Sequence, residues 1–388
     1  MEIRRESELL DTNVREPITL PLERARPPVG SRLKILFAVA SWGLGHSTRD
    51  LPLIQRMLEE GHAVTIISSG RALALLKQEL GCHCEYLEWP DLPHGLAKNA
   101  PLFYAKFVFS LPVALRAIIA EHRAVDQLLN QQPFDRIVSD SRFGVRSRRV
   151  TSFQLSHGLR FIAPHRARLM EVFMDYVFYR CYGRTTHLIV PDFDVDGLSG
   201  DLSHNLRFLS PRRISYVGLL SGIRRQELPR DLDCYVSVSG PEPQRTILEE
   251  TILDQIGDVD GRVIVSLGKP ERAGESWTRH GVTVHSYVNR QQQEQLMNRA
   301  RMIVSRSGYT TMMEIAELGS RALFIPTPGQ TEQEYLAAYH ARHGTYYSVR
   351  QNRLDLPRDL AIAADFPGYG PAYRTEESIR RFLEIVSN

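Results

Sequence analysis

Short apolar runs alternate with amphipathic helical patterns along most of this chain, and this alternation restricts the fold more than any other feature. Predicted strands in the first part lie at 33–40, 62–68, 83–89 and 135–140, with predicted helices at 49–61, 71–81 and 112–131. A second series has strands at 233–240, 262–268, 282–288, 302–308 and 322–328, with helices at 244–256, 290–300, 309–319 and 331–343. Strands that alternate with helices predict an α/β protein with parallel, doubly wound sheets.

The length of 388 residues favours two hydrophobic cores over one. We therefore predict two Rossmann-like domains that face each other across a cleft. The predicted divisions are a disordered N-terminal lead-in at 1–31, an N-terminal domain at 32–220, a C-terminal domain at 221–370, and a terminal helix at 371–388 that packs back on the N-terminal domain. The linker is expected within 218–231, and ligands of such sheets bind where the strands end.

Charge and cysteine content limit the function classes. The net charge of +3 is too small to indicate a nucleic-acid partner. The cysteines form no CxxC pairs, and Cys82-His83-Cys84 is interpreted as free thiols rather than a metal site. The acidic string at 191–197 is interpreted as a loop, so no metal is predicted. Without a signal peptide or a membrane-spanning run, the sequence predicts a cytoplasmic location.

The stretch "VSRSGYTTMMEIAELG" carries the most chemical information. Arg306, Ser307 and Gly308 end a strand, and Tyr309 and Thr310 then begin a helix. Backbone N–H groups at a helix N-terminus suit a diphosphate.

Three side chains further along the chain complete a candidate sugar-nucleotide site. Glu314, within the same helix, is placed to accept both hydroxyls of a ribose. Gln333 and Glu334 begin the helix after "IPTP", and an amide beside a carboxylate suits sugar hydroxyls.

This ordered set, strand–"RSG"–helix–Glu–"LG"–strand–"PxP"–"QE", resembles the nucleotide-sugar half of GT-B glycosyltransferases, in particular the MurG type with its family-28 C-terminal domain. The resemblance implies that Ser307 and Gly308 meet the diphosphate, that Glu314 binds the ribose, and that backbone near Val288 meets uracil. It also implies that Gln333 and Glu334 reach the donor sugar. That family usually has Gln-Gln, so the identity of the sugar stays open.

A second diphosphate turn of that family is replaced here by "VSLGKPERAG". Ser266 and Gly268 keep its small residues, and Lys269 could neutralise phosphate charge.

The loop "SWGLGHSTRD" at 41–50 has neither the G-x-G-x-x-G spacing nor the lysine of a phosphate loop. It resembles the "GxGHxxR" loop of GT-B enzymes and of related UDP-sugar hydrolases. Gly43 and Gly45 would allow close backbone approach, and His46 would be a base facing the cleft. The alternative is that His46 only caps a helix. Asp140, 94 residues later, is the candidate for orienting His46, or else a helix cap.

Residues 142–184 combine nine arginines with an aromatic run and only two acidic residues. This composition favours an anionic membrane surface, or an acceptor that carries lipid and phosphate. The alternative is a core helix with arginines along its rim. His157, in the same region, is a candidate second base on the acceptor side or a structural residue.

Together these features predict a metal-independent, inverting glycosyltransferase that moves a hexosyl or N-acetylhexosaminyl group from a UDP-sugar to a glycan or lipid-linked acceptor. The N-terminal domain would hold the acceptor and the C-terminal domain the nucleotide sugar, with no cofactor and with peripheral contact at the inner membrane face. A UDP-sugar hydrolase, a nucleotide-sugar 2-epimerase and a non-catalytic partner subunit of a glycosyltransferase remain alternatives.

Overall fold

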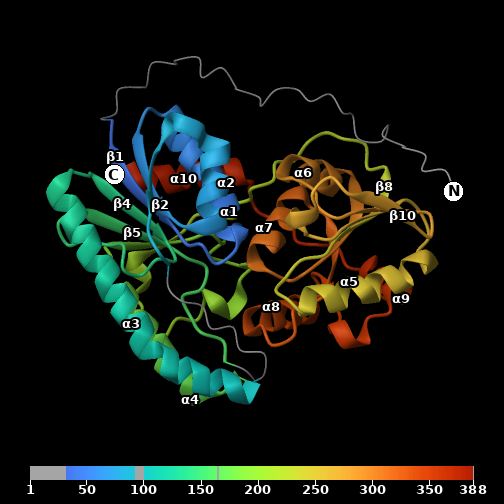
Figure 1. Ribbon diagram of the computed structural model, residues 1–388. Coiled ribbons are helices and arrows are strands. Elements are labelled where there is room, and N and C mark those ends of the chain that lie inside the picture. Colours follow the sequence, from blue (N-terminus) through green and yellow to red (C-terminus); the bar gives the residue numbers. More distant parts are fainter. Residues whose placement is uncertain (1–31, 92–99, 164–165, 388) are drawn as a thin grey trace.

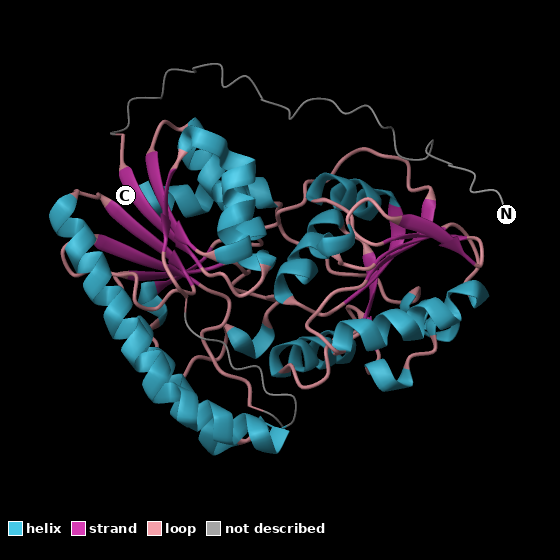
Figure 2. Cartoon of the chain, viewed as in Figure 1, coloured by secondary structure: helices cyan, strands magenta, loops and turns pink. Residues whose placement is uncertain are grey.

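The computed structural model describes residues 32–91, 100–163 and 166–387, with the backbone alone over 100–111. The predicted lead-in at 1–31 lies outside these residues. The described chain forms two α/β bodies, each built on a seven-stranded sheet (Figure 1). Helices lie on both sides of each sheet (Figure 2), so the predicted architecture of two doubly wound sheets is confirmed.

The N-terminal sheet has the order β3-β2-β1-β4-β5-β6-β7, and all its pairings are parallel. Its strands are β1 (Lys34–Val39), β2 (Ala63–Ser68), β3 (Glu85–Glu88), β4 (Arg136–Asp140), β5 (Thr151–Leu155), β6 (His187–Val190) and β7 (Ile214–Tyr216). Its helices are α1 (Leu44–Glu59), α2 (Gly70–Leu80), α3 (Ala100–Gln131) and α4 (Arg168–Tyr182). The central strands β1 and β2 are buried almost throughout, which explains their unbroken apolar runs.

The C-terminal sheet has the order β10-β11-β9-β8-β12-β13-β14, with only the β10–β11 pair antiparallel. Its strands are β8 (Leu232–Ser237), β9 (Val263–Ser266), β10 (Ser276–Arg279), β11 (Val282–His285), β12 (Ala300–Ser305), β13 (Arg321–Phe324) and β14 (Tyr347–Ser348). Its helices are α5 (Gln244–Gln255), α6 (Arg290–Arg299), α7 (Tyr309–Leu318), α8 (Thr331–Arg342) and α9 (Leu356–Ala363).

Two helices start earlier than the sequence pattern predicts. The helix expected at 112 begins at Ala100 and continues through Pro112, which the pattern treats as a start. The helix expected at 49 begins at Leu44, because Gly43 takes a φ of 119° that ends the preceding loop abruptly. His46 therefore lies in the first turn of α1 rather than in a loop.

The last helix, α10 (Thr375–Ser387), returns to the N-terminal sheet, as its position beside β1 and β2 in Figure 1 shows. Its buried residues Ile379, Phe382 and Val386 join the cluster that contains Phe37 and Leu53. Its first turn is fixed by the other body, because Glu317 of α7 accepts from both the backbone N–H and the hydroxyl of Thr375.

The two bodies also share a hydrophobic core. Phe193 and Leu198, in the loop after β6, belong to the same buried cluster as Met312 and Leu336 of the C-terminal body. Buried His340 of α8 donates from Nε2 to the carbonyl of Leu198, at 2.8 Å. One side of the junction is therefore packed like the interior of a single domain.

Within the described ranges, no helix combines the length and the apolar character that crossing a bilayer requires.

Candidate active site

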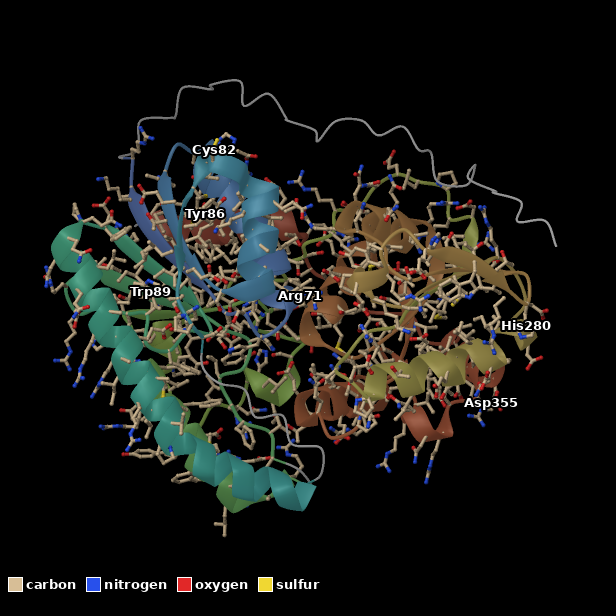
Figure 3. All side chains as sticks on the ribbon, in the orientation of Figure 1. Arg71, Cys82, Tyr86, Trp89, His280 and Asp355 are labelled. Carbon is tan, nitrogen blue, oxygen red and sulfur yellow. The ribbon has the colours of Figure 1, made fainter. Side chains whose placement is uncertain are left out.

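A cavity of about 1580 Å³ lies between the two bodies. Its walls come from α1, α2 and the segments after β4 and β5 on one side, and from β8, β9, α6, α7 and α8 on the other. Arg71, at the start of α2, lies between the two bodies in Figure 3. The carboxyl ends of both sheets thus face one cleft, as expected for open α/β sheets.

The N-termini of α1 and α7 meet in this cleft. A Cβ built on Gly45 would lie 2.9 Å from Oγ1 of Thr310, which is closer than side chains ordinarily approach. Gly45 is therefore needed for close packing between the two bodies, and Gly43 for its positive φ. Both glycines line the cavity.

Four side chains of the N-terminal body form a largely buried polar network at the cleft. Nδ1 of His46 lies 2.9 Å from Oδ2 of Asp140. Arg49, one turn further along α1, donates from Nε to Oδ2 at 2.8 Å and from Nη2 to Oδ1. The hydroxyl of Ser141 also donates to Oδ1. Asp140 thus accepts hydrogen bonds on both oxygens and caps no helix, and His46 is not the cap of α1, where Gly43 holds that position.

This network keeps Asp140 ionised. Burial alone would raise its pKa, but the charges and hydrogen bonds of Arg49 and His46 outweigh burial and hold the pKa well below the usual range. Buried Asp50 shows the opposite shift, because burial and then the charge of Asp140 raise its pKa well above the usual value. A fixed anion beside Nδ1 favours the His46 tautomer with its proton on Nδ1, which leaves the Nε2 lone pair to accept a proton.

His157 follows β5 and lies against the same network. Its Nδ1 is 3.0 Å from Nη1 of Arg49, and its ring stacks on Tyr309 with centroids 4.2 Å apart. On its other edge, Nε2 faces Oε1 of Glu332 across the cleft at 3.3 Å. The sequence-predicted candidates of the N-terminal body are therefore all brought together.

The turn that precedes α7 presents its backbone to the cavity. Gly308, Tyr309 and Thr310 line it. The hydroxyl of Tyr309 is buried and donates to the carbonyl of Pro191, which fixes α7 against the N-terminal body. N–H groups at a helix start have no partner within the helix, and they are the groups that a diphosphate would need.

Three other residues predicted for the phosphates do not reach the cavity. Arg306 donates to four backbone carbonyls around β8, β13 and α5, and burial lowers its pKa to about 10. The hydroxyl of Ser307 donates to the carbonyl of Gln333. Lys269 forms an ion pair with Glu249 at 2.6 Å. These side chains shape the loops rather than face a ligand.

The residue predicted to meet the nucleobase and the two small residues of the second diphosphate turn do line the cavity. Val288 lies there, close to the start of α6. Ser266 shares a hydrogen bond with the hydroxyl of Tyr235 at 2.7 Å. Gly268 has a φ of 61°, and a Cβ there would come within 2.7 Å of the carbonyl of Val238. Only glycine fits this turn without displacing backbone.

Glu314 lines the cavity from the second turn of α7 and is 7% exposed. Burial raises the pKa of its carboxyl to about 7, with Arg290 opposing the shift and Glu294 adding to it. An ionised carboxylate accepts hydrogen bonds from both hydroxyls of a diol, and a protonated carboxyl can also donate one.

At the start of α8 the predicted sugar pair is divided. Gln333 lines the cavity, and its Oε1 accepts from the backbone N–H of Thr327 at 2.8 Å. Glu334 is exposed outside the cavity and accepts from the N–H of Gly329 at 3.0 Å. Glu332 lines the cavity instead. The carboxylate of Glu334 is held instead by the loop before α8, where Gly329 donates to it.

Sequence reasoning missed Arg49, Glu332 and Arg290 as cleft residues. Arg49 had a signal, because it is the last residue of the "GHSTR" string, three positions after His46 and thus on the same face of α1. Arg290 pairs with Glu79 of α2 at 3.2 Å across the two bodies. Such contacts between distant segments leave no trace in a local pattern.

Among the side chains that the structure describes, no three His, Cys, Asp or Glu residues lie close enough together to hold a metal ion. In the predicted acidic loop, Asp192 accepts from the backbone N–H groups of Phe193, Leu198 and Ser199, so it fixes the loop.

Comparison with known proteins bears on the fold and on the C-terminal body. Residues 245–364 match the family model described as "Glycosyltransferase family 28 C-terminal domain". A comparison with the curated proteins finds no match.

Among solved structures, the glycotransferase of kitacinnamycin is similar with a TM-score of 0.62, 15% identity, and coverage of 92% of this chain and 96% of that one. MurG of Acinetobacter baumannii is similar with a TM-score of 0.54 and 12% identity, and the match covers 91% of this chain and 99% of that one. UGT89C1 of Arabidopsis thaliana, complexed with UDP-L-rhamnose, has a TM-score of 0.55 and 17% identity, and the match covers 92% of this chain and 94% of that one. The chain has the GT-B fold of these glycosyltransferases, as predicted, and residues 245–364 are similar to the family-28 C-terminal domain.

The raised pKa of Glu314 predicts a measurable pH dependence of stability. The folded pKa of about 7 exceeds the value of about 4.3 expected in an unfolded chain, so the folded state holds the proton more tightly. Rising pH should therefore lower the free energy of unfolding between about pH 4.3 and about pH 7, by up to about 3 kcal/mol, with no further loss above that window. Glu314→Gln, which cannot ionise, should abolish this loss.

Urea unfolding of both proteins at about pH 4.5 and about pH 8 measures the effect. Glu334→Gln is the matched control, because Glu334 is exposed and should leave the pH dependence as in wild type. An unchanged pH dependence in Glu314→Gln would show that this carboxyl titrates normally.

Proposed function

We propose that this protein is a glycosyltransferase that moves a sugar from a nucleotide sugar, with UDP as the expected nucleotide, to an acceptor hydroxyl. One observation carries the proposal: the first turn of α1, with His46, and the N-terminus of α7, with Gly308, meet across one cleft. The group that accepts a proton and the group that holds a phosphate then lie on opposite sides of the same reacting centre.

The proposed step is a single displacement. Nε2 of His46 takes the proton of the acceptor hydroxyl while that oxygen attacks the anomeric carbon. The bond from this carbon to the β-phosphate oxygen breaks, and its electron pair leaves with UDP, whose charge is stabilised by the N–H groups at the start of α7. Asp140 orients His46 and offsets its positive charge. Attack from the opposite side inverts the anomeric carbon.

For the donor, we propose that Glu314 binds the ribose, that the backbone near Val288 meets the base, and that Gln333 and Glu332 contact the sugar. Glu332 takes the place that the sequence assigned to Glu334, since it lines the cavity. The related UGT89C1 binds UDP-L-rhamnose, which supports a UDP-sugar in this cleft.

The size of the cavity favours transfer over hydrolysis. At about 1580 Å³ it exceeds the ~300–1,000 Å³ that usually hold one small ligand. The walls on the N-terminal side include Phe143, Phe161 and Phe178. Such an apolar wall suits a second substrate better than water.

Incubation with a panel of UDP-sugars, with and without lipid-linked and glycan acceptors and with excess EDTA, tests the proposal. Acceptor-dependent UDP release that survives EDTA is expected. Full-rate UDP release without an acceptor would instead identify a hydrolase, and a changed sugar without UDP release an epimerase. No turnover together with no UDP-induced rise in melting temperature would favour a non-catalytic subunit.

His46→Ala should lower turnover by about a hundredfold to ten-thousandfold, since it removes the base. UDP affinity, measured by calorimetry, should stay close to wild type because the proposed nucleotide contacts lie on the other body. His83→Ala, at an exposed position, is the control. Unchanged turnover in His46→Ala would remove this residue from the mechanism.

We also propose that α4 contacts a membrane surface. Leu169, Phe173 and Tyr176 lie on one face of this helix and are 89%, 55% and 47% exposed. Arg168 and Arg180 on α4 are exposed too, whereas Arg142 and Arg160, from the same basic region, are buried in ion pairs. Exposed apolar residues beside cations suit an anionic bilayer, and a location at the inner membrane face would follow.

Vesicles that contain phosphatidylglycerol should therefore sediment the wild-type protein. Leu169→Glu combined with Phe173→Glu should weaken this binding about tenfold or more, since it removes two exposed apolar side chains. Ile247→Glu, at an apolar residue that is 42% exposed on α5, should bind as wild type. Equal binding of all three proteins would exclude α4 as the contact.

A further inference from the structure

We propose that Arg49 and Asp140 hold the two cleft histidines in opposite tautomers, so that His157 is a hydrogen-bond donor that positions Glu332 and only His46 is left with a basic nitrogen facing the reaction. The tautomers concern the protein without ligand. The role of Glu332 toward a donor sugar rests on the proposed function.

The tautomer of His157 follows from the chemistry of its neighbour. Nη1 of Arg49 lies 3.0 Å from Nδ1 of His157. A guanidinium only donates hydrogen bonds and stays protonated in proteins. Nδ1 of His157 must therefore be the acceptor, and the single proton of the neutral ring lies on Nε2.

The opposite edge of the ring requires the same tautomer. Nε2 of His157 faces Oε1 of Glu332 at 3.3 Å, and a carboxylate accepts hydrogen bonds. The ring is held between these two partners because it stacks on Tyr309, with the planes only 9° apart. With its lone pair engaged by Arg49, Nδ1 of His157 is not placed to take a proton from an acceptor hydroxyl, so the second-base role raised by the sequence is not the one this geometry favours.

His46 lies under the opposite constraint. Its Nδ1 is 2.9 Å from an oxygen of ionised Asp140. Without a proton, Nδ1 would direct a lone pair at that oxygen, so the proton belongs on Nδ1. Nη2 of Arg49 also lies 3.0 Å from Nδ1 and has a second N–H besides the one donated to Oδ1 of Asp140. The two partners of Nδ1 therefore favour opposite tautomers, and we assign the proton from the carboxylate. One ion pair thus determines both rings: its anion sets His46 and its cation sets His157.

The consequence reaches the other body of the protein. Glu332 lies in the first turn of α8, directly before Gln333. A hydrogen bond from His157 to one carboxylate oxygen leaves the second oxygen to accept from a sugar hydroxyl. His157 is then a positioning residue: the N-terminal body sets the orientation of a donor-sugar contact that belongs to the C-terminal body.

NMR of the intact protein with ¹⁵N-labelled histidine, at about pH 7.5 and without ligand, tests the tautomers. The variants His46→Gln and His157→Gln identify the two signals. We expect His157 to carry its proton on Nε2 and His46 on Nδ1. A proton on Nδ1 of His157, a doubly protonated His157, or the same tautomer in both rings would overturn the proposal.

Two substitutions at one position separate the donor role from simple packing. The amide of Gln reaches about as far as Nε2 of histidine and can still donate to Glu332, whereas Asn reaches only about as far as Nδ1. Affinities for UDP-glucose, UDP-N-acetylglucosamine and UDP are measured by calorimetry. For the UDP-sugar that wild type binds more tightly, His157→Asn should weaken binding about tenfold, and His157→Gln should stay within about threefold of wild type.

UDP alone should bind equally to wild type and both variants, and His83→Asn is the matched surface control. Combined with Glu332→Ala, His157→Asn should cause no further loss, because the two residues act as one unit. Equal losses of UDP-sugar affinity in His157→Gln and His157→Asn would contradict the positioning role. So would losses of affinity that add when His157→Asn is combined with Glu332→Ala. If wild type binds UDP but neither UDP-sugar, this role for Glu332 is overturned; if it binds none of the three, the proposed function fails as well, and the NMR result still decides the tautomers.

Discussion

The buried ion pair between Arg49 and Asp140 is the interaction on which the cleft depends. Buried charges are costly unless every partner is present, and a broken pair leaves one charge uncompensated. Here the carboxylate accepts from Arg49, His46 and Ser141, so little of its hydrogen-bonding capacity is left unused. The pair joins the second turn of α1, one turn after His46, to the end of β4, and so fixes where the base lies relative to the sheet.

The same pair explains why two histidines in one cleft need not be two bases. The tautomer of an imidazole depends on the groups that meet Nδ1. Nδ1 of His46 meets the carboxylate of Asp140 as well as Arg49, whereas Nδ1 of His157 meets Arg49. The site therefore has one residue suited to accept a proton and one suited to donate a hydrogen bond. Residue type alone, as read from the sequence, cannot make this distinction.

The two-sheet fold could be predicted from the sequence because central parallel strands are buried on both faces and read as apolar runs. Strand β5 was missed because its buried residues include Ser152 and Gln154, and α9 because a proline lies at its start. Helix starts and strand ends could be located from the sequence, so the positions of His46, Gly308 and Glu314 at the cavity, and of Asp140 beside His46, are as expected. The directions of side chains could not be predicted. The sequence therefore assigned Arg306, Lys269 and Glu334 to the site, although they point away from the cavity, and it overlooked Glu332.

The shared core also changes how the two bodies can be regarded. Proteins with two facing sheets invite the idea of exchangeable halves, one for each substrate. Here α10 packs in the hydrophobic core of the N-terminal body although it comes last in the chain. The loop after β6 packs into the C-terminal body. A chimera that joins another N-terminal half near residue 220 would leave α10 without the sheet against which it packs. It would also expose the buried cluster that contains Leu336. Evolution or engineering of a new acceptor range in this chain has to proceed by changes within the cleft wall rather than by exchange of whole halves.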